Sequence, residues 1–280
     1  MKITAYDKIK SLILSMRFKT TPLGVICVYV GGLVAGAQYN SLNLFLAMLS
    51  TLFIGSSAQT INDYFDWNID KINHPERPIP KGILKPNEML YFSIILFLIG
   101  FIISIFINLL CVLIVVFSLI MLILYEKYLK NIGITGNITV GFISALSFTY
   151  GGAAVGNPFA SILLSAIAFF LFTGRETLKD VQDVKGDVLS RSTLPMKIGE
   201  KNAAIVGSVF LIIALLITPL PYLLGQLRIG YLLFITIVDL ICIYAIIETL
   251  KDLRNTERTV SLLRIASAIG IIAIIIGAVL

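Results

Sequence analysis

The residues in this sequence best suited to chemistry are six aspartates in two groups. The spacing DxxDxxxD occurs once in NDYFDWNID and again in KDVQDVKGD. At about 100° per residue, positions i, i+3 and i+7 fall on one face of a helix. Each group is therefore expected to form a carboxylate stripe. The candidate catalytic residues are Asp63, Asp66, Asp70, Asp180, Asp183 and Asp187.

Carboxylates this close repel each other unless a cation neutralises them. Oxygen ligands suit Mg²⁺, which takes one or two protein carboxylates and completes its shell with water and substrate phosphates. Two facing groups would hold two Mg²⁺ ions with a diphosphate between them. Zinc is disfavoured, because the chain has one histidine and its cysteines lie in apolar runs. The candidate metal ligands are Asn62, Asp66, Asp70, Asp180, Asp183 and Asp187. The alternative is a solvated, charged helix end.

Basic and polar residues near both groups are candidates for binding the diphosphate oxygens. They are Asn62, Arg77, Tyr125, Lys127, Lys130, Lys179 and Arg191. Each has another explanation. Basic residues on one face of a membrane protein report its orientation, and a tyrosine at a helix end fits the interfacial aromatic belt.

The elements that position these residues must be membrane helices. The chain is 58% hydrophobic and 14% charged, with mean hydropathy +0.95, whereas soluble proteins carry about 25% charged residues. We therefore expect an all-α polytopic membrane protein whose net charge of +6 favours anionic lipid and not nucleic acid. A span needs about 20 apolar residues. The predicted spans are 20–38, 42–62, 88–107, 109–128, 136–155, 158–177, 202–222, 229–249 and 260–279.

The charges predict orientation. With these nine spans, every basic residue except Arg228 lies on one face. The positive-inside rule makes this face cytoplasmic, so the protein sits in the cell membrane with its N-terminus inside and its C-terminus outside. We expect a single domain over 1–280. Residues 1–19 form an amphipathic surface helix, and 63–87 and 178–201 form cytoplasmic, aspartate-rich loops that cap the bundle.

Both motifs resemble those of a known family. NDYFDWNIDKINHPERPIPKG resembles the first signature of the UbiA superfamily of intramembrane prenyltransferases, and GRETLKDVQDVKGD followed by STLP resembles the second. The resemblance implies nine helices around a central cavity open to lipid, and two Mg²⁺ ions that bind an isoprenyl diphosphate. It puts the metal positions at Asn62, Asp66, Asp70, Asp183 and Asp187, with Asp63 and Asp180 beside them.

Within this family the chain is most similar to archaeal members that make ether lipids. This similarity implies transfer of a geranylgeranyl group from geranylgeranyl diphosphate to the free hydroxyl of geranylgeranylglyceryl phosphate, a lipid-phosphate acceptor. An aromatic acid acceptor, 4-hydroxybenzoate or a naphthoate, is the alternative. A lipid transporter is less favoured, because only Asp239 among the acids is predicted in mid-span. Asp239 is either structural or substrate-related.

Overall fold

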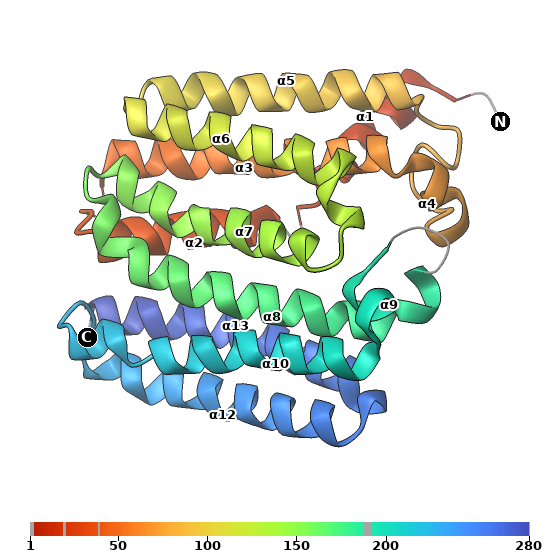
Figure 1. Cartoon of the computed structure of the whole chain (residues 1–280). Coiled ribbons are helices and arrows are strands. Elements are labelled where there is room, and N and C mark those ends of the chain that lie inside the picture. The colour runs from red at the N-terminus through yellow and green to blue at the C-terminus, as the bar shows by residue number, and fades with distance from the viewer. Residues whose placement is uncertain (1–2, 19–20, 39, 188–191, 280) are drawn as a thin grey trace.

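The chain folds into a bundle of roughly parallel helices (Figure 1). The computed structural model describes residues 3–18, 21–38, 40–187 and 192–279, and the regular structure in these ranges is helical. The longer helices are α1 (Ala5–Ser15), α2 (Thr21–Val34), α3 (Leu42–Phe65), α5 (Pro86–Ile105), α6 (Leu109–Lys127), α7 (Ile134–Ala154), α8 (Ile162–Asp187), α10 (Glu200–Ile217), α12 (Ile229–Lys251) and α13 (Thr256–Val279). Short helices are α4 (Trp67–Asn73), α9 (Leu194–Ile198), α11 (Leu220–Leu223), η1 (Leu129–Asn131), η2 (Pro158–Ser161) and η3 (Leu253–Asn255).

Each of the nine predicted spans corresponds to one of the longer helices of the described chain. Seven of these helices are long and apolar enough to cross a membrane. The two exceptions are α2 and α7. With 14 residues, α2 is about 21 Å long, shorter than a hydrocarbon core of about 30 Å. α7 has the length, but Gly, Thr and Asn lower its hydropathy. The prediction of an all-α polytopic membrane protein is confirmed.

Local signals explain where neighbouring helices separate. The Asn108 side chain caps α6 by accepting a hydrogen bond from the Cys111 N–H at 2.9 Å, and its amide donates to the Ala153 carbonyl at 2.8 Å. The apolar run of 88–128 is thus divided at Asn108, as the sequence predicts. Gly156 has a φ of +83°, which a residue with a side chain rarely adopts, and this turn ends α7 ahead of Pro158.

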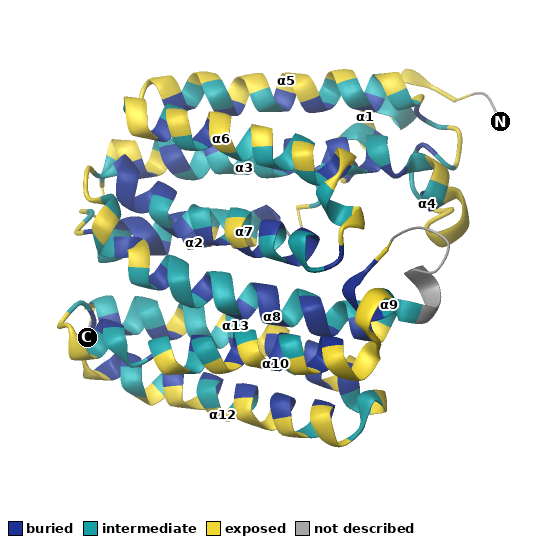
Figure 2. Ribbon diagram, viewed as in Figure 1, coloured by how far each residue is buried: buried dark blue, intermediate teal, exposed yellow. Residues whose placement is uncertain are grey.

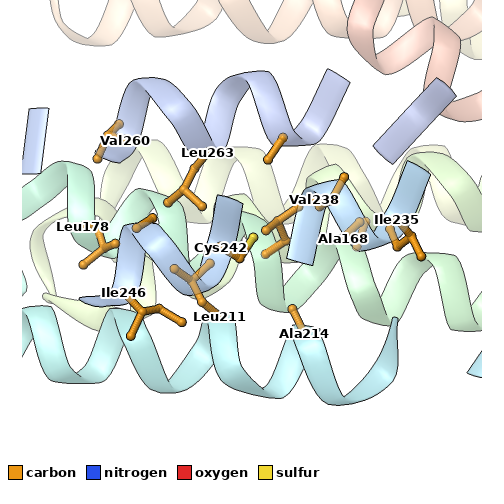
Figure 3. Close-up of a cluster of buried hydrophobic side chains, with 14 of the residues drawn as sticks. Ala168, Leu178, Leu211, Ala214, Ile235, Val238, Cys242, Ile246, Val260 and Leu263 are labelled. Carbon is orange, nitrogen blue, oxygen red and sulfur yellow. The ribbon is translucent and has the colours of Figure 1, made fainter. Parts of the chain in front are cut away.

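Burial follows the expectation for a bundle in lipid. Figure 2 shows exposed residues along α5, α6 and α12, and many of them are large and apolar, such as Leu109 and Phe106. The buried side is packed instead. Leu178, Leu211 and Leu263, from α8, α10 and α13, meet in one apolar cluster (Figure 3). The outward apolar faces are suited to lipid contact.

The two aspartate segments lie at one end of the bundle (Figure 1). α3, α6 and α8 end there, and α4 and α9 lie across it. The predicted cap segments are therefore partly helical: 63–87 includes α4, and 178–201 includes the last turns of α8 together with α9. α1 lies at the same end, with Tyr6, Ile9 and Leu14 exposed. The chain ends at the opposite end of the bundle.

Candidate functional site

The first aspartate group does not lie on one continuous helix. α3 ends at Phe65 and α4 begins at Trp67, and Asp66 between them has φ −94° and ψ 5°. The predicted continuous helix is therefore interrupted at the middle residue of this group, although Arg77 Nη1 still contacts both Asp63 and Asp70. All three aspartates are nevertheless buried: Asp63, Asp66 and Asp70 are 4%, 5% and 3% exposed.

Two arginines neutralise the outer pair of these aspartates. Arg77 donates from Nη1 to Asp70 Oδ2 at 2.6 Å and to Asp63 Oδ1 at 3.2 Å. Arg17, in the connection between α1 and α2, donates from Nη2 to the same Asp63 oxygen and from Nη1 to Gln59 at 2.8 Å. A buried carboxylate is stable only with such a partner. Arg77, a predicted diphosphate ligand, thus lies at this aspartate group. The sequence analysis did not identify Arg17.

A second network surrounds Asp66. Lys130 Nζ donates to Asp66 Oδ1 at 2.5 Å and to Glu126 Oε2 at 2.8 Å. The Asn62 amide nitrogen donates to Asp66 Oδ2 at 3.0 Å and to Glu126 Oε1 at 2.9 Å. Glu126 is 4% exposed, and the analysis of the sequence missed it. The available signal was its spacing of i, i+4 from Lys130 at the end of an apolar run, typical of a helical ion pair.

The second aspartate group does lie on one helix. α8 continues through Asp187, ten residues beyond the predicted span end at 177, so positions 180, 183 and 187 share a face. Asp180 accepts a hydrogen bond from the Asn137 amide at 2.8 Å, and Lys179 lies 3.9 Å from Asp183. Asn137, on α7, is a further missed contact.

The structure says less about the other predicted residues. The side chain of Asp187 and the whole of Arg191 lie outside the part of the chain that the structure describes. Lys127 is exposed and forms no hydrogen bond or ion pair with the described residues. Tyr125 is half-buried, one residue before Glu126. Of the predicted basic residues, Arg77, Lys130 and Lys179 contact motif aspartates.

A cavity of about 450 Å³ lies inside the bundle, close to both aspartate groups. It lies among α2, α3, α6, α7 and α8, and its wall is mainly apolar, with Gln59, Arg175 and Glu176 among its polar residues. Gln59 is four residues before Asp63 on α3, and Glu176 is four residues before Asp180 on α8. One helical turn therefore separates the cavity wall from each aspartate group, so both groups stand at the end of one chamber.

The donor set fits magnesium better than a softer metal. The described side chains contain no group of three His, Cys, Asp or Glu residues arranged to hold a metal ion. Mg²⁺ does not require one, because water and substrate phosphates complete its octahedral shell. The amide oxygen of Asn62 and the carboxylates of Asp66 and Asp70 are hard ligands of the right type.

Asp239 lies far from these groups in the sequence and in the middle of α12. One of its oxygens accepts a hydrogen bond from Thr218 at 3.2 Å, and the other is buried without a partner among the described residues. A small cavity of about 50 Å³ adjoins it. This hydrogen bond to the end of α10 is expected for a structural role, one of the two roles of Asp239 that the sequence left open.

Known relatives match nearly the whole chain. The digeranylgeranylglyceryl phosphate synthase of Pyrococcus furiosus is 34% identical, covering 97% of this chain and 98% of its own. The enzyme of the same name from Methanosarcina mazei is 37% identical, covering 83% and 81%. A solved structure of a digeranylgeranylglyceryl phosphate synthase superposes with a TM-score of 0.85 at 32% identity, over 98% of this chain and 99% of that one.

A more distant structure shares the fold. A UbiA homolog from Archaeoglobus fulgidus, bound to GPP and Mg²⁺, gives a TM-score of 0.71 at 19% identity, over 95% of this chain and 98% of that chain. The model of the UbiA prenyltransferase family matches residues 24–268. These residues include both aspartate groups and the Lys130 network, and the chain belongs to the UbiA prenyltransferase family.

Proposed function

We propose that this chain transfers a geranylgeranyl group from geranylgeranyl diphosphate to the free hydroxyl of geranylgeranylglyceryl phosphate, and so forms the second ether bond of an archaeal membrane lipid. The names of its relatives support this choice of donor and acceptor. The single observation that carries the proposal is the mainly apolar cavity, whose wall lies one turn from each aspartate group. Such a chamber suits an isoprenoid chain whose diphosphate lies among the aspartates.

In this proposal the aspartates would hold two Mg²⁺ ions at the diphosphate, and these ions would supply stabilisation of the charge that develops on the departing group. The residues that would hold them are Asn62, Asp66, Asp70, Asp183 and Asp187, with Asp63 and Asp180 beside them. Arg77 and Lys130 already pair with these aspartates. Both side chains can replace part of their contact with the carboxylates by contact with diphosphate oxygens, since carboxylate and diphosphate are both anionic oxygen acceptors. Lys127, Lys179 and Arg191 are further candidates for this contact.

The chemistry follows from the charges. The allylic C1–O bond breaks, the diphosphate leaves with the electron pair, and a delocalised cation remains on the isoprenoid. The acceptor hydroxyl attacks C1, the ether forms, and the hydroxyl proton passes to a base, which is a motif carboxylate, the released diphosphate or the acceptor phosphate. Water must be excluded because it would yield an alcohol, and the apolar wall provides this exclusion.

The proposed orientation follows the distribution of basic residues. The N-terminus and both aspartate segments face the cytoplasm, and the C-terminus faces outside. The chain works as a single domain of nine spans, in which α1 lies on the membrane surface and the segments around α4 and α9 cap the chamber.

The test is a transfer assay on purified protein with geranylgeranyl diphosphate and Mg²⁺. Geranylgeranylglyceryl phosphate and 4-hydroxybenzoate are offered separately, with EDTA in parallel samples. We expect a diether from the lipid only, abolished by EDTA. Asp66→Asn should reduce the rate at least about 100-fold, beyond the loss typical of residues next to a metal ligand. Asp252→Asn is the control, because Asp252 pairs with its neighbour Arg254.

The possible outcomes separate the alternatives. Product from 4-hydroxybenzoate alone would contradict the lipid acceptor but retain the metal site. Transfer that resists EDTA, or an Asp66→Asn variant as active as Asp252→Asn, would contradict the metal–diphosphate assignment. Absence of transfer to either acceptor would contradict the proposed reaction.

A further inference from the structure

A second pocket lies outside the chamber, next to the first aspartate group. Its volume is about 540 Å³, and it is formed by α1, the end of α3 and the segment of 76–83. Four basic side chains line it: Lys10, Arg17, Arg77 and Lys81. The proposed reaction leaves this pocket without a role.

We propose that this pocket binds the phosphate monoester of the lipid acceptor, an inference that rests on the proposed function. The acceptor phosphate and the donor diphosphate are both anionic and must approach within a few bonds of each other. Like charges repel strongly at short range. A separate set of cations for the acceptor phosphate reduces this repulsion and fixes the position of the acceptor hydroxyl.

The acids of the pocket engage two of its four cations in ion pairs, and, after the hydrogen bonds with Thr4, the charge of Lys10 also contributes to the lowered pKa of Asp7. The acids that line it already have partners: Asp63 is paired with Arg17 and Arg77. The other two acids are held by their own neighbours: Asp7 accepts from Thr4 at 2.6 Å, a bond that lowers the pKa of its carboxyl, and Glu76 contacts His74.

The two lysines that line the pocket, unlike its acids, have no hydrogen-bond or ion-pair partner among the described residues. Both Lys10 and Lys81 are exposed. A phosphate monoester carries about −1.5 to −2 charges near neutral pH. Two lysines on facing elements, α1 and the 76–83 segment, suit such a group better than either lysine would alone.

The apolar residues of the pocket indicate a lipid. Ile3 and Leu14 also line it, and they are 48% and 64% exposed. Along α1, Ile9 and Ile13 are exposed as well, which is typical of a helix lying at the membrane surface. A phosphate at this level with an apolar tail in the bilayer satisfies both kinds of side chain, whereas a soluble phosphate would leave the apolar ones unused.

The position of the pocket agrees with the reaction. Arg77 contacts Asp63, which lines the pocket, and also Asp70, in the proposed metal site. Arg17 reaches from Asp63 to Gln59, which lines the inner chamber. The Arg77 side chain thus lies between the pocket and the proposed metal site, and the Arg17 side chain lies between the pocket and the inner chamber. In the acceptor, the proposed hydroxyl is on the carbon next to the one that carries the phosphate, so a phosphate in the pocket brings the hydroxyl to the chamber.

The test compares two acceptors that differ only in the phosphate, geranylgeranylglyceryl phosphate and geranylgeranylglycerol, at saturating donor. For the Lys10→Gln/Lys81→Gln double variant we expect kcat/KM for the phosphorylated acceptor to fall about tenfold, as for two partly exposed charge contacts. The kcat/KM for geranylgeranylglycerol and the KM for geranylgeranyl diphosphate should each change less than twofold. Lys251→Gln, an exposed lysine at the end of α12, is the matched control. Binding of radiolabelled phosphorylated acceptor without donor should weaken by the same factor.

Several results would overturn the inference. Unchanged use and binding of the phosphorylated acceptor by the double variant would remove the lysines from the site. Equal losses with both acceptors would indicate an effect on the fold or on the donor. A loss that appears with both acceptors only in vesicles rich in anionic lipid would assign the lysines to membrane attachment. If the wild type makes no ether from either lipid, the proposed function itself fails, and that result is distinct from the others.

Discussion

At the scale of single residues, one amide connects the two halves of the Asp66 network. Asn62 donates to both Asp66 and Glu126 through the same nitrogen. An amide oxygen in that place would face two carboxylates, so the contacts fix the orientation of the group. The amide oxygen is consequently directed away from both acids. In the proposed function Glu126 is a positioning residue, because its contact with the Asn62 nitrogen would keep the Asn62 oxygen free for a cation.

This role predicts the effect of Glu126→Gln. The glutamine amide can either accept from or donate to the Asn62 amide, so it no longer fixes one orientation of that group. Lys130 retains only Asp66 as its anionic partner. We expect the Mg²⁺ concentration for half-maximal activity to rise about tenfold, as for other residues next to metal ligands. A titration of activity against Mg²⁺ measures it, with Glu200→Gln, at the exposed start of α10, as the control. An unchanged Mg²⁺ dependence with a lower rate would contradict the positioning role.

At the scale of elements, the wall of the chamber depends on how closely α2 and α7 approach. A Cβ atom added at Gly31 would lie 2.0 Å from the Phe148 carbonyl oxygen, and one added at Gly151 would lie 1.9 Å from the Val28 carbonyl oxygen. Both distances are far below contact, so these two backbones meet directly. The absence of a side chain at Gly31 and Gly151 allows this close packing.

Gly31→Ala should therefore force α2 and α7 apart. Overpacking of a tight interface costs about 1–3 kcal/mol, which lowers the thermal midpoint by several degrees in a chain of this size. Thermal inactivation in detergent measures the loss. Gly24→Ala is the matched control on the same helix, because its Cβ would meet its nearest atom at an ordinary 3.7 Å. Equal midpoints for the two variants would contradict a backbone contact between the helices.

At the scale of the whole molecule, nearly all charge gathers at one end of the bundle. The native cysteines are buried, so they should give little background in thiol labelling. A cysteine replacing Glu76, beside α4, should resist a membrane-impermeant thiol reagent in intact cells and react once the cells are opened. Leu224→Cys, from an exposed position at the opposite end, should react in intact cells. The reverse pattern would invert the proposed orientation.

The sequence by itself determined the membrane class, the places of the long apolar helices and the two aspartate groups, because hydropathy, caps and spacing are local properties of the chain. Asn108 illustrates this, since its cap and the division of 88–128 both follow from neighbouring residues. The same local signals failed at Asp66, where α3 ends and α4 begins. At the second group the expectation agrees with the structure, because α8 continues as a helix past the apolar stretch through Asp187.

Only the tertiary structure decided which side chains complete the site. Arg17 reaches Asp63 across 46 residues, Glu126 reaches Asn62 across 64, and Asn137 reaches Asp180 across 43. No local pattern selects these partners, because each contact depends on which helices become neighbours at the same end of the bundle. The physical reason is burial: once packing removes Asp63 and Asp66 from water, they require cations or amides from whatever elements lie beside them.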